Sequence, residues 1–144
     1  MNTAWRVWDG KQMYYYGDEG ICLSIGELGS IDGKVFGWSL WLDGYGVIAH
    51  SGDGKSVLMW GTGLKDKKGK DIYQKDITED LFVNPLFKEN VIDRYVIERW
   101  KGIDRMNHVS KKSQLDRFLW WYRLDEIEVV GNVFENPELL EGVE

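Results

Sequence analysis

The sequence predicts a mainly β protein, and three observations support that class. Aromatic residues make up 14% of the 144 residues, glycine is abundant with 17 copies, and proline is scarce with 2. Apolar and polar residues alternate in several short runs, which is the pattern of strands with one buried face. Asp-Gly pairs separate several of these runs, and such pairs are typical of tight hairpin turns. We therefore expect about eight to ten short strands that close into a barrel or stack as a sandwich.

Turn signals divide the first 60 residues into these short runs. Asp9 and Gly10 lie between two aromatic-rich runs and predict a hairpin. The same dipeptide recurs at 43–44 and 53–54, where it predicts two later turns. Residues 36–42 alternate between large apolar and smaller side chains, which predicts a strand. The expected strands of this part are 5–8, 13–16, 21–25, 36–42, 45–49 and 57–60.

The remainder of the chain begins with another turn signal. Asp66 and Gly69 bound a four-residue reversal that fits a type I turn closed by a left-handed glycine. The run from Thr78 to Leu81 predicts the start of a short helix that Pro85 interrupts. Further expected elements are a strand at 94–100, a long mobile loop or poorly formed hairpin at 101–114, a strand at 115–124, a strand at 126–134 with Ile127 and Val129 buried, and one helical turn at 137–140.

Charge and cysteine usage exclude several classes. The net charge is −6: residues 1–60 hold 4 basic and 7 acidic side chains, residues 61–123 hold 14 and 10, and residues 124–144 hold none and 7. An acidic chain is repelled from bulk DNA. No apolar run approaches the ~18 residues of a membrane span. The single cysteine, Cys22, excludes an internal disulfide and a zinc site of several thiolates, and we expect no metal or cofactor. Because the sequence starts without an apolar signal segment, we expect a cytoplasmic protein.

No set of residues predicts catalysis. Residues 49–56 loosely match a phosphate-binding loop, but that chemistry needs a helix from Lys55, and residues 57–60 predict a strand. We interpret the segment as a glycine-rich hairpin tip. His50 and His108 lack a metal-ligand spacing and are expected in exposed loops, while Cys22 is expected to be a buried, inert thiol. Adjacent carboxylates point to opposite faces of a strand, so they form poor acid–base pairs. We expect no enzyme.

The segment 94–123 interleaves aromatic and basic residues. Its candidate partner-binding residues are Arg99, Trp100, Trp121 and Arg123. On the expected strand 115–124, Trp121 lies between Leu119 and Arg123 on one face, and the apolar opposite face belongs in the core. One of the two adjacent tryptophans then faces a second core, a partner subunit, a partner protein or a ligand. Because strand edges and aromatic faces are templates for pairing, we also expect a homo-oligomer.

Three blocks of the sequence resemble the YopX family of bacteriophage and prophage proteins. They are Trp-Arg-Val-Trp-Asp with Lys-Gln-Met-Tyr near the start, residues 62–73, and residues 127–140. Lys75 departs from the family, which has glycine before the aspartate that stands at position 76. The resemblance implies a small, partly open barrel of the Src-homology-3 type with an additional N-terminal β portion. It places that portion at 1–60 and the barrel at 61–144, with a variable insert at 81–124, in one compact unit.

The family has no established catalytic residues, so the resemblance implies a source and a fold. We expect a non-enzymatic phage or prophage accessory protein that binds a host or defence protein in the cytoplasm of the bacterial host. The alternative is binding of a nucleotide, including a signalling nucleotide, or of nucleic acid through the basic-aromatic segment 94–123.

Overall fold

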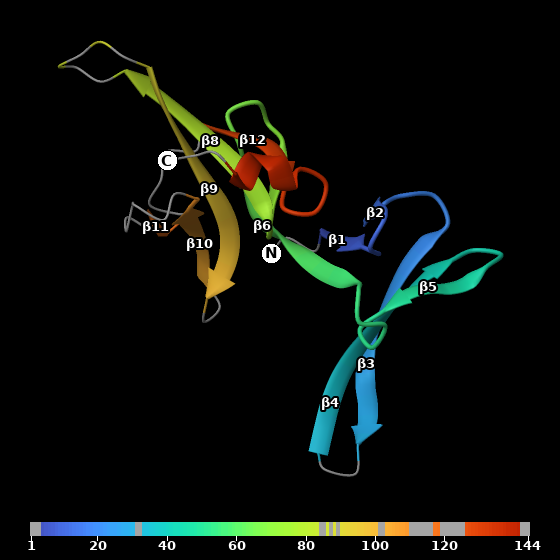
Figure 1. Ribbon diagram of the computed structural model, residues 1–144. Coiled ribbons are helices and arrows are strands. Elements are labelled where there is room, and N and C mark those ends of the chain that lie inside the picture. The colour runs from blue at the N-terminus through green and yellow to red at the C-terminus, as the bar shows by residue number, and fades with distance from the viewer. Residues whose placement is uncertain are drawn as a thin grey trace. The chain divides into compact units, whose positions relative to one another are not determined.

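The computed structural model describes residues 4–30, 33–83, 86, 88, 90–100, 103–109, 117–118 and 126–141. Within these residues the regular structure consists of β-strands and a single 3-10 turn, which confirms the mainly β class (Figure 1). The chain divides after Trp60 into two compact units. We call them the N-terminal unit, which ends at Trp60, and the C-terminal unit, which begins at Gly61.

The N-terminal unit begins with the predicted hairpin. Strands β1 (Trp5–Trp8) and β2 (Met13–Tyr15) pair antiparallel, and β6 (Val57–Lys65) lies along the other side of β1. The Asp9 carboxylate accepts the amides of Lys11 at 2.8 Å and Gln12 at 2.7 Å, and Gly10 has a φ of 103°. Aspartate and glycine therefore play the roles that the sequence predicted for this turn.

A three-stranded antiparallel sheet completes the N-terminal unit. It contains β3 (Ile21–Ser30), β4 (Gly33–Leu42) and β5 (Gly46–His50), with β4 in the centre (Figure 1). Leu23, Leu40 and Ala49 are cross-strand neighbours in the register and belong to one apolar cluster. The buried members of that cluster are Trp5, Val7, Leu40 and Ala49. One face of this sheet is thus part of the core.

The C-terminal unit is built on a five-stranded antiparallel sheet with the order β11-β10-β9-β8-β12, in which β8 and β9 curl (Figure 1). Its strands are β8 (Asp76–Val83), β9 (Asn90–Trp100), β10 (Ile103–His108), β11 (Arg117–Phe118) and β12 (Ile127–Asn132), and the short β7 (Asp71–Tyr73) pairs with β6. The core contains Ile72, Tyr95, Ile97, Met106, Ile127 and Val129. Burial of Ile127 and Val129 confirms the prediction for the last strand.

One predicted element is wrong, because residues 78–81 belong to strand β8 rather than to a helix. For residues 101–114 the loop alternative is wrong, since residues 103–108 form strand β10, which pairs antiparallel with β9 as in the hairpin alternative. Both β8 and β9 are paired on both sides, so ladder hydrogen bonds with two neighbours outweigh the local helix-start signal of Thr78. The tight register of β9 and β10, with Ile103 opposite Trp100, satisfies the backbone that the prediction left without partners.

Two turns of the C-terminal unit use the left-handed region. Gly69 has a φ of 81° and its amide donates to the Asp66 carbonyl at 3.0 Å, which confirms the predicted turn. Lys75, where the resembling family has glycine, keeps a φ of 70°. Its Nζ lies 2.9 and 2.8 Å from the two carboxylate oxygens of Glu98. Lys75 therefore adopts the left-handed conformation that glycine favours.

The chain ends in the predicted helical turn, a 3-10 turn η2 (Pro137–Leu140) with proline in its first positions. An Arg94 Nη atom donates to the Leu139 carbonyl at 3.3 Å, which holds this turn against β9. Of the predicted strand 115–124, the structure describes only Arg117 and Phe118. The facing of Trp120 and Trp121 lies outside the described residues.

Candidate functional site

The three-stranded sheet presents a second face that is opposite its core face. Side chains alternate along β3 and β4, so the sequence neighbours of Leu23 and Leu40 point away from the core. On β5 a register shift places Val47 opposite Trp41 and His50 opposite Ser39, while Ile48 packs against the core. We call this surface the outer face. It consists of Cys22, Ser24 and Gly26 on β3, Gly37, Ser39 and Trp41 on β4, and Val47 and His50 on β5. No Asp, Glu, Lys or Arg belongs to this set.

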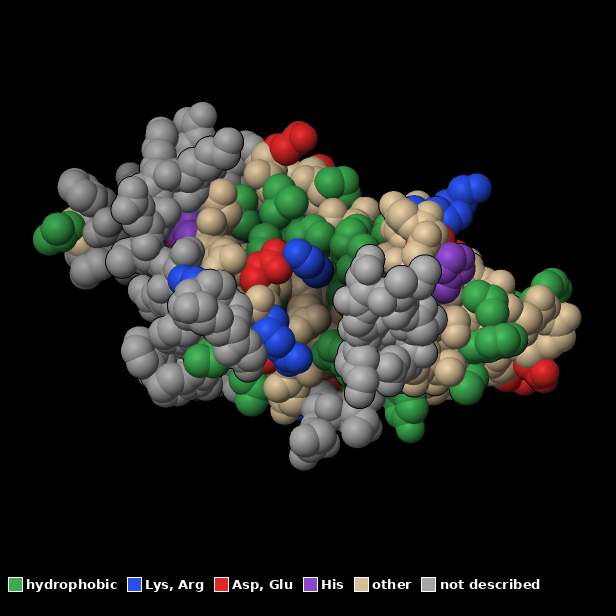
Figure 2. Space-filling model, turned by 90° about the horizontal axis from the view of Figure 1, so that it is seen from below, with side chains coloured by type: hydrophobic (Ala, Val, Ile, Leu, Met, Phe, Trp, Pro, Cys, Tyr) green, Lys and Arg blue, Asp and Glu red, His purple; other side chains and the backbone are tan. Residues whose placement is uncertain are grey.

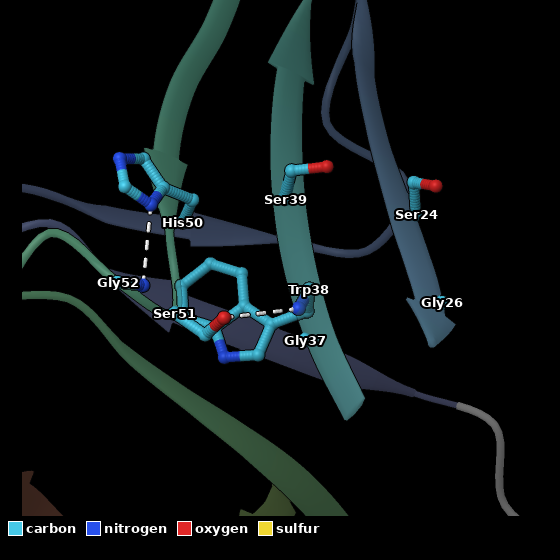
Figure 3. A pocket seen from close by; sticks show the side chains of 8 residues that line it. All are labelled: Ser24, Gly26, Gly37, Trp38, Ser39, His50, Ser51 and Gly52. Atoms are coloured by element: carbon cyan, nitrogen blue, oxygen red, sulfur yellow. Dashed lines mark hydrogen bonds between the residues drawn. The ribbon is translucent and has the colours of Figure 1, made fainter. Parts of the chain in front are cut away.

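The outer face is organised in cross-strand rows. Trp41 stands between Cys22 and Val47, and both Trp41 and Val47 are 44% exposed. Ser39 stands between Ser24 and His50 in the next row, and the three side chains come from three neighbouring strands (Figure 3). The indole Nε1 of Trp41 donates to the Ser39 hydroxyl at 2.9 Å, which joins the two rows. An apolar row thus adjoins a polar one.

A hollow of about 280 Å³ lies over the polar row (Figure 3). It is lined by Ser24, Gly26, Gly37, Trp38, Ser39, His50, Ser51 and Gly52. The Gly52 amide donates to Nδ1 of His50 at 3.1 Å, whereas a Ser-His-Asp triad needs that nitrogen to donate to a carboxylate. The hollow therefore offers hydroxyl and imidazole groups for hydrogen bonding, and its histidine is oriented by the backbone rather than by a carboxylate.

A second hollow, of about 540 Å³, adjoins the apolar row. It is lined by Gly20, Cys22, Trp41, Leu42, Asp43, Gly44 and Gly46. The Asp43 amide donates to the Gly20 carbonyl at 2.8 Å, so the turn before β3 and the turn after β4 lie side by side. Trp41 belongs to this hollow and also contacts the polar row, which places an exposed indole at the centre of the site.

The loop that resembles a phosphate-binding motif is filled by its own carboxylate. The amides of Lys55 and Ser56 donate to Oδ1 of Asp53 at 3.0 and 2.7 Å, and the His50 amide donates to Oδ2 at 3.2 Å. Burial alone would raise the pKa of Asp53, but these bonds and the Ser56 hydroxyl hold it well below its usual range. Strand β6 begins at Val57, where a phosphate-binding loop would begin a helix. The loop is a structural turn.

The predicted partner-binding residues are only partly described. Arg99 lies on β9 with its Nε 3.2 Å from Asp104 Oδ1, and Trp100 is the last residue of β9. Trp121 and Arg123 lie outside the described residues, so their role and the homo-oligomer stay predictions.

The alternative nucleotide or nucleic-acid site required free cations on the same segment. Arg94 pairs through Nε with Glu79 Oε2 at 2.6 Å, and Arg99 pairs with Asp104. Their positive charges are therefore already compensated within the sheet, and a phosphate would have to displace a carboxylate from each. This arrangement weakens the alternative for the two arginines it includes.

Two predictions for single residues are wrong. His108 was expected in an exposed loop, but it lies on β10 with its side chain 8% exposed. Its Nε2 is 3.1 Å from Asp93 Oδ1, and its ring packs edge-on against Tyr95. Cys22 was expected to be buried, but it is exposed on the outer face, because the strand register turns Leu23 inward instead. His50 is exposed, as predicted, but it is the last residue of strand β5 rather than part of a loop.

No group of three or more His, Cys, Asp or Glu side chains has the arrangement of a metal site within the described part of the chain. Among the same residues, no helix has the length and apolar character required to cross a membrane.

Comparison with known proteins identifies the family. The family model described as YopX protein matches residues 4–141. The SPbeta prophage-derived protein YopX of Bacillus subtilis (strain 168) is 35% identical over an alignment of 144 positions, which covers 99% of this chain and 99% of that protein. The crystal structure of YopX from Bacillus subtilis superposes with a TM-score of 0.66 at 32% identity, covering 98% of this chain and 100% of that one. A protein from Enterococcus faecalis shares the fold, with a TM-score of 0.51 at 22% identity over 98% of this chain and 100% of that one. The chain belongs to the YopX family.

Proposed function

We propose that this protein is a non-enzymatic phage or prophage accessory protein that binds a host or defence protein through the outer face of its N-terminal sheet. The proposal depends on one observation: the face opposite the core is uncharged and exposes Trp41 and Val47 side by side. Contiguous exposed apolar surface of this kind marks interaction sites in soluble proteins. The bacterial cytoplasm is the compartment in which such a partner would be met.

The composition of the outer face fits a protein interface. Tryptophan is among the residues that contribute most to binding energy, and such residues lie near the centre of an interface with polar groups around them. Trp41 has this position, since Ser39 and the polar row lie on one side of it and the second hollow on the other. At Gly26 a side chain would meet nothing within 4 Å, so a partner backbone can approach the sheet closely there.

The open edges of the sheet add backbone donors and acceptors. Within the described strands, β3 and β5 each pair only with β4, so each leaves one edge of its backbone available. A partner strand can extend such a sheet by main-chain hydrogen bonds while side chains of the outer face provide specificity. Protein binding uses both features, whereas nucleic-acid binding would require cations that the outer face lacks.

The proposal is tested by site-specific photo-crosslinking in bacterial host cells. A photoreactive phenylalanine replaces Ser24 on the outer face or, as a matched control, the exposed Lys67 in a turn of the C-terminal unit. We expect a discrete adduct from position 24 that is absent from position 67. The adduct should be lost in Trp41→Ala and kept in Leu86→Ala, which truncates an apolar side chain of the other unit that is 84% exposed.

Two results would overturn the proposal. One is the same adducts from positions 24 and 67, which would indicate contact without a defined face. The other is an adduct from position 24 that survives Trp41→Ala while that variant keeps the thermal unfolding midpoint of the parent protein. Comparing unfolding midpoints separates loss of binding from loss of folding.

A further inference from the structure

Two turns meet at one end of the three-stranded sheet, and they share an unusual composition. The turn from Tyr16 to Gly20 precedes β3, and the turn from Asp43 to Tyr45 joins β4 to β5. The Asp43 amide donates to the Gly20 carbonyl at 2.8 Å, so the two turns are adjacent in space. Together with Trp41 they surround the second hollow.

The charge of these turns is entirely negative. Asp18, Glu19 and Asp43 are exposed, and neither turn contains a lysine or an arginine. Among the described residues no cation pairs with Glu19 or Asp43. Asp18 uses one oxygen to accept the Tyr15 amide at 2.8 Å, which fixes its carboxylate at the turn. Uncompensated like charges at one end of a sheet favour a partner of the opposite sign.

One aromatic side chain, Trp41, lines the same hollow, and two exposed tyrosines belong to the adjoining turns. Trp41 is 44% exposed, Tyr45 is 81% exposed and Tyr16 is 61% exposed. The ring of Tyr16 is held edge-on by Trp5 at 5.9 Å, so it is oriented and not free. At the right-hand end of Figure 2, toward which β5 extends in Figure 1, exposed hydrophobic side chains lie beside acidic ones. Aromatic faces and carboxylates together form the environment in which proteins bind organic cations.

We infer that this hollow binds a lysine- or arginine-rich segment of the partner protein, with a cationic side chain over Trp41 and its charge near Asp43 and Glu19. The inference rests on the proposed function and names the chemistry of its partner. A cationic side chain suits both features of the hollow, because its aliphatic stem covers the indole while its head meets the carboxylates. Neither a phosphate nor an acidic peptide satisfies the charge.

The site carries its own probe. Cys22 is the only cysteine of the chain, and it lines the hollow beside Trp41. The rate at which iodoacetamide alkylates Cys22 in the purified full-length protein therefore reports occupancy. The ligands compared are an eight-residue peptide of alternating arginine and glycine, the same peptide with glutamate in place of arginine, and spermidine.

Charge-neutralising variants test the acidic groups. Glu19→Gln combined with Asp43→Asn removes one charge from the lining of the hollow and one from the adjoining turn. Glu138→Gln combined with Glu141→Gln removes two exposed charges from the C-terminal unit as the matched control. We expect the arginine peptide to slow alkylation of Cys22 and the glutamate peptide to leave it unchanged. At low salt, the first double variant should bind the arginine peptide about tenfold more weakly than the parent protein does. The control double variant should change the affinity for this peptide by less than about twofold.

Several outcomes would overturn this inference. One is equal peptide affinity for the two double variants. Another is that spermidine protects Cys22 from alkylation as well as the arginine peptide does, which would assign the hollow to a free polyamine. A third is protection of Cys22 that rises with protein concentration alone, which would assign the hollow to a second copy of this chain. A Trp41-dependent crosslink at position 24 that is unchanged by Glu19→Gln with Asp43→Asn would overturn the inference and leave the proposed function standing. Loss of dependence on Trp41 overturns the proposed function itself.

Discussion

Replacing Asp66 by alanine should destabilise the C-terminal unit strongly, because one carboxylate satisfies three backbone amides. Oδ1 accepts from Lys68 and Lys70, each at 2.9 Å, and Oδ2 accepts from Val129 at 2.8 Å. The first two amides belong to the turn itself. The third belongs to β12, more than 60 positions later, so Asp66 joins the turn to the edge of the five-stranded sheet.

The magnitude follows from what each amide loses. Val129 is 7% exposed, and a buried amide left without an acceptor costs about 1–3 kcal/mol. Lys68 and Lys70 are exposed, so water replaces the carboxylate and each loss costs about 0.5–1 kcal/mol. The expected decrease in the free energy of unfolding is therefore about 2–5 kcal/mol, measured by urea unfolding followed by circular dichroism.

A matched variant removes a carboxylate from the same hairpin. Asp71 pairs with Lys65 at 3.3 Å, and both side chains are largely exposed, so Asp71→Ala should cost less than about 1 kcal/mol. If Asp66→Ala and Asp71→Ala unfold at the same urea concentration, the carboxylate of Asp66 does not hold β12, and the reasoning is refuted.

Three further predictions concern acid, a glycine and a lysine. Burial would raise the pKa of Asp66, but the amide hydrogen bonds and the charge of Lys70 lower it, so the stabilisation by this carboxylate is complete above the unfolded-state pKa of about 3.9 and is lost as pH falls further. Between pH 7 and pH 2 the urea midpoint should fall less in Asp66→Asn than in the parent protein, and parallel profiles of the two would contradict this. Gly69→Val should cost about 1–3 kcal/mol through its φ of 81° alone, since a side chain there meets nothing within 4 Å, and an unchanged melting temperature would disprove the turn. Lys75→Gly should be more stable than Lys75→Ala by about 1 kcal/mol, because both variants lose the Glu98 ion pair but only glycine relieves the φ of 70°; the reverse order in urea unfolding would show that this backbone is unstrained.

Features fixed by short-range chemistry could be predicted from the sequence. The Asp9 turn and the Asp66–Gly69 turn need a carboxylate and a left-handed glycine a few residues apart, and both residue types are visible in the sequence. The burial of Ile127 and Val129 follows from strict alternation along one strand. Such signals do not depend on which strands become neighbours.

Features decided by distant pairing could not be predicted in the same way. Residues 78–81 have a helix-start composition, yet β8 is fixed by pairing with β9 and β12. The exposure of Cys22 depends on which face of β3 meets the core, and a run of apolar residues does not specify that. The outer face was missed for this reason, although the alternation around Trp41 was the signal that, combined with the register, could have found it.

Thiol accessibility in living cells tests the central claim most directly. Cys22 lies next to Trp41 on the outer face and is exposed in the isolated protein, so a small alkylating reagent should modify it readily after purification. If a partner covers this face, the same reagent should modify Cys22 at least about tenfold more slowly in bacterial host cells, and Trp41→Ala should restore the faster rate. Equal rates for Cys22 in cells and in the purified protein would contradict binding through the outer face.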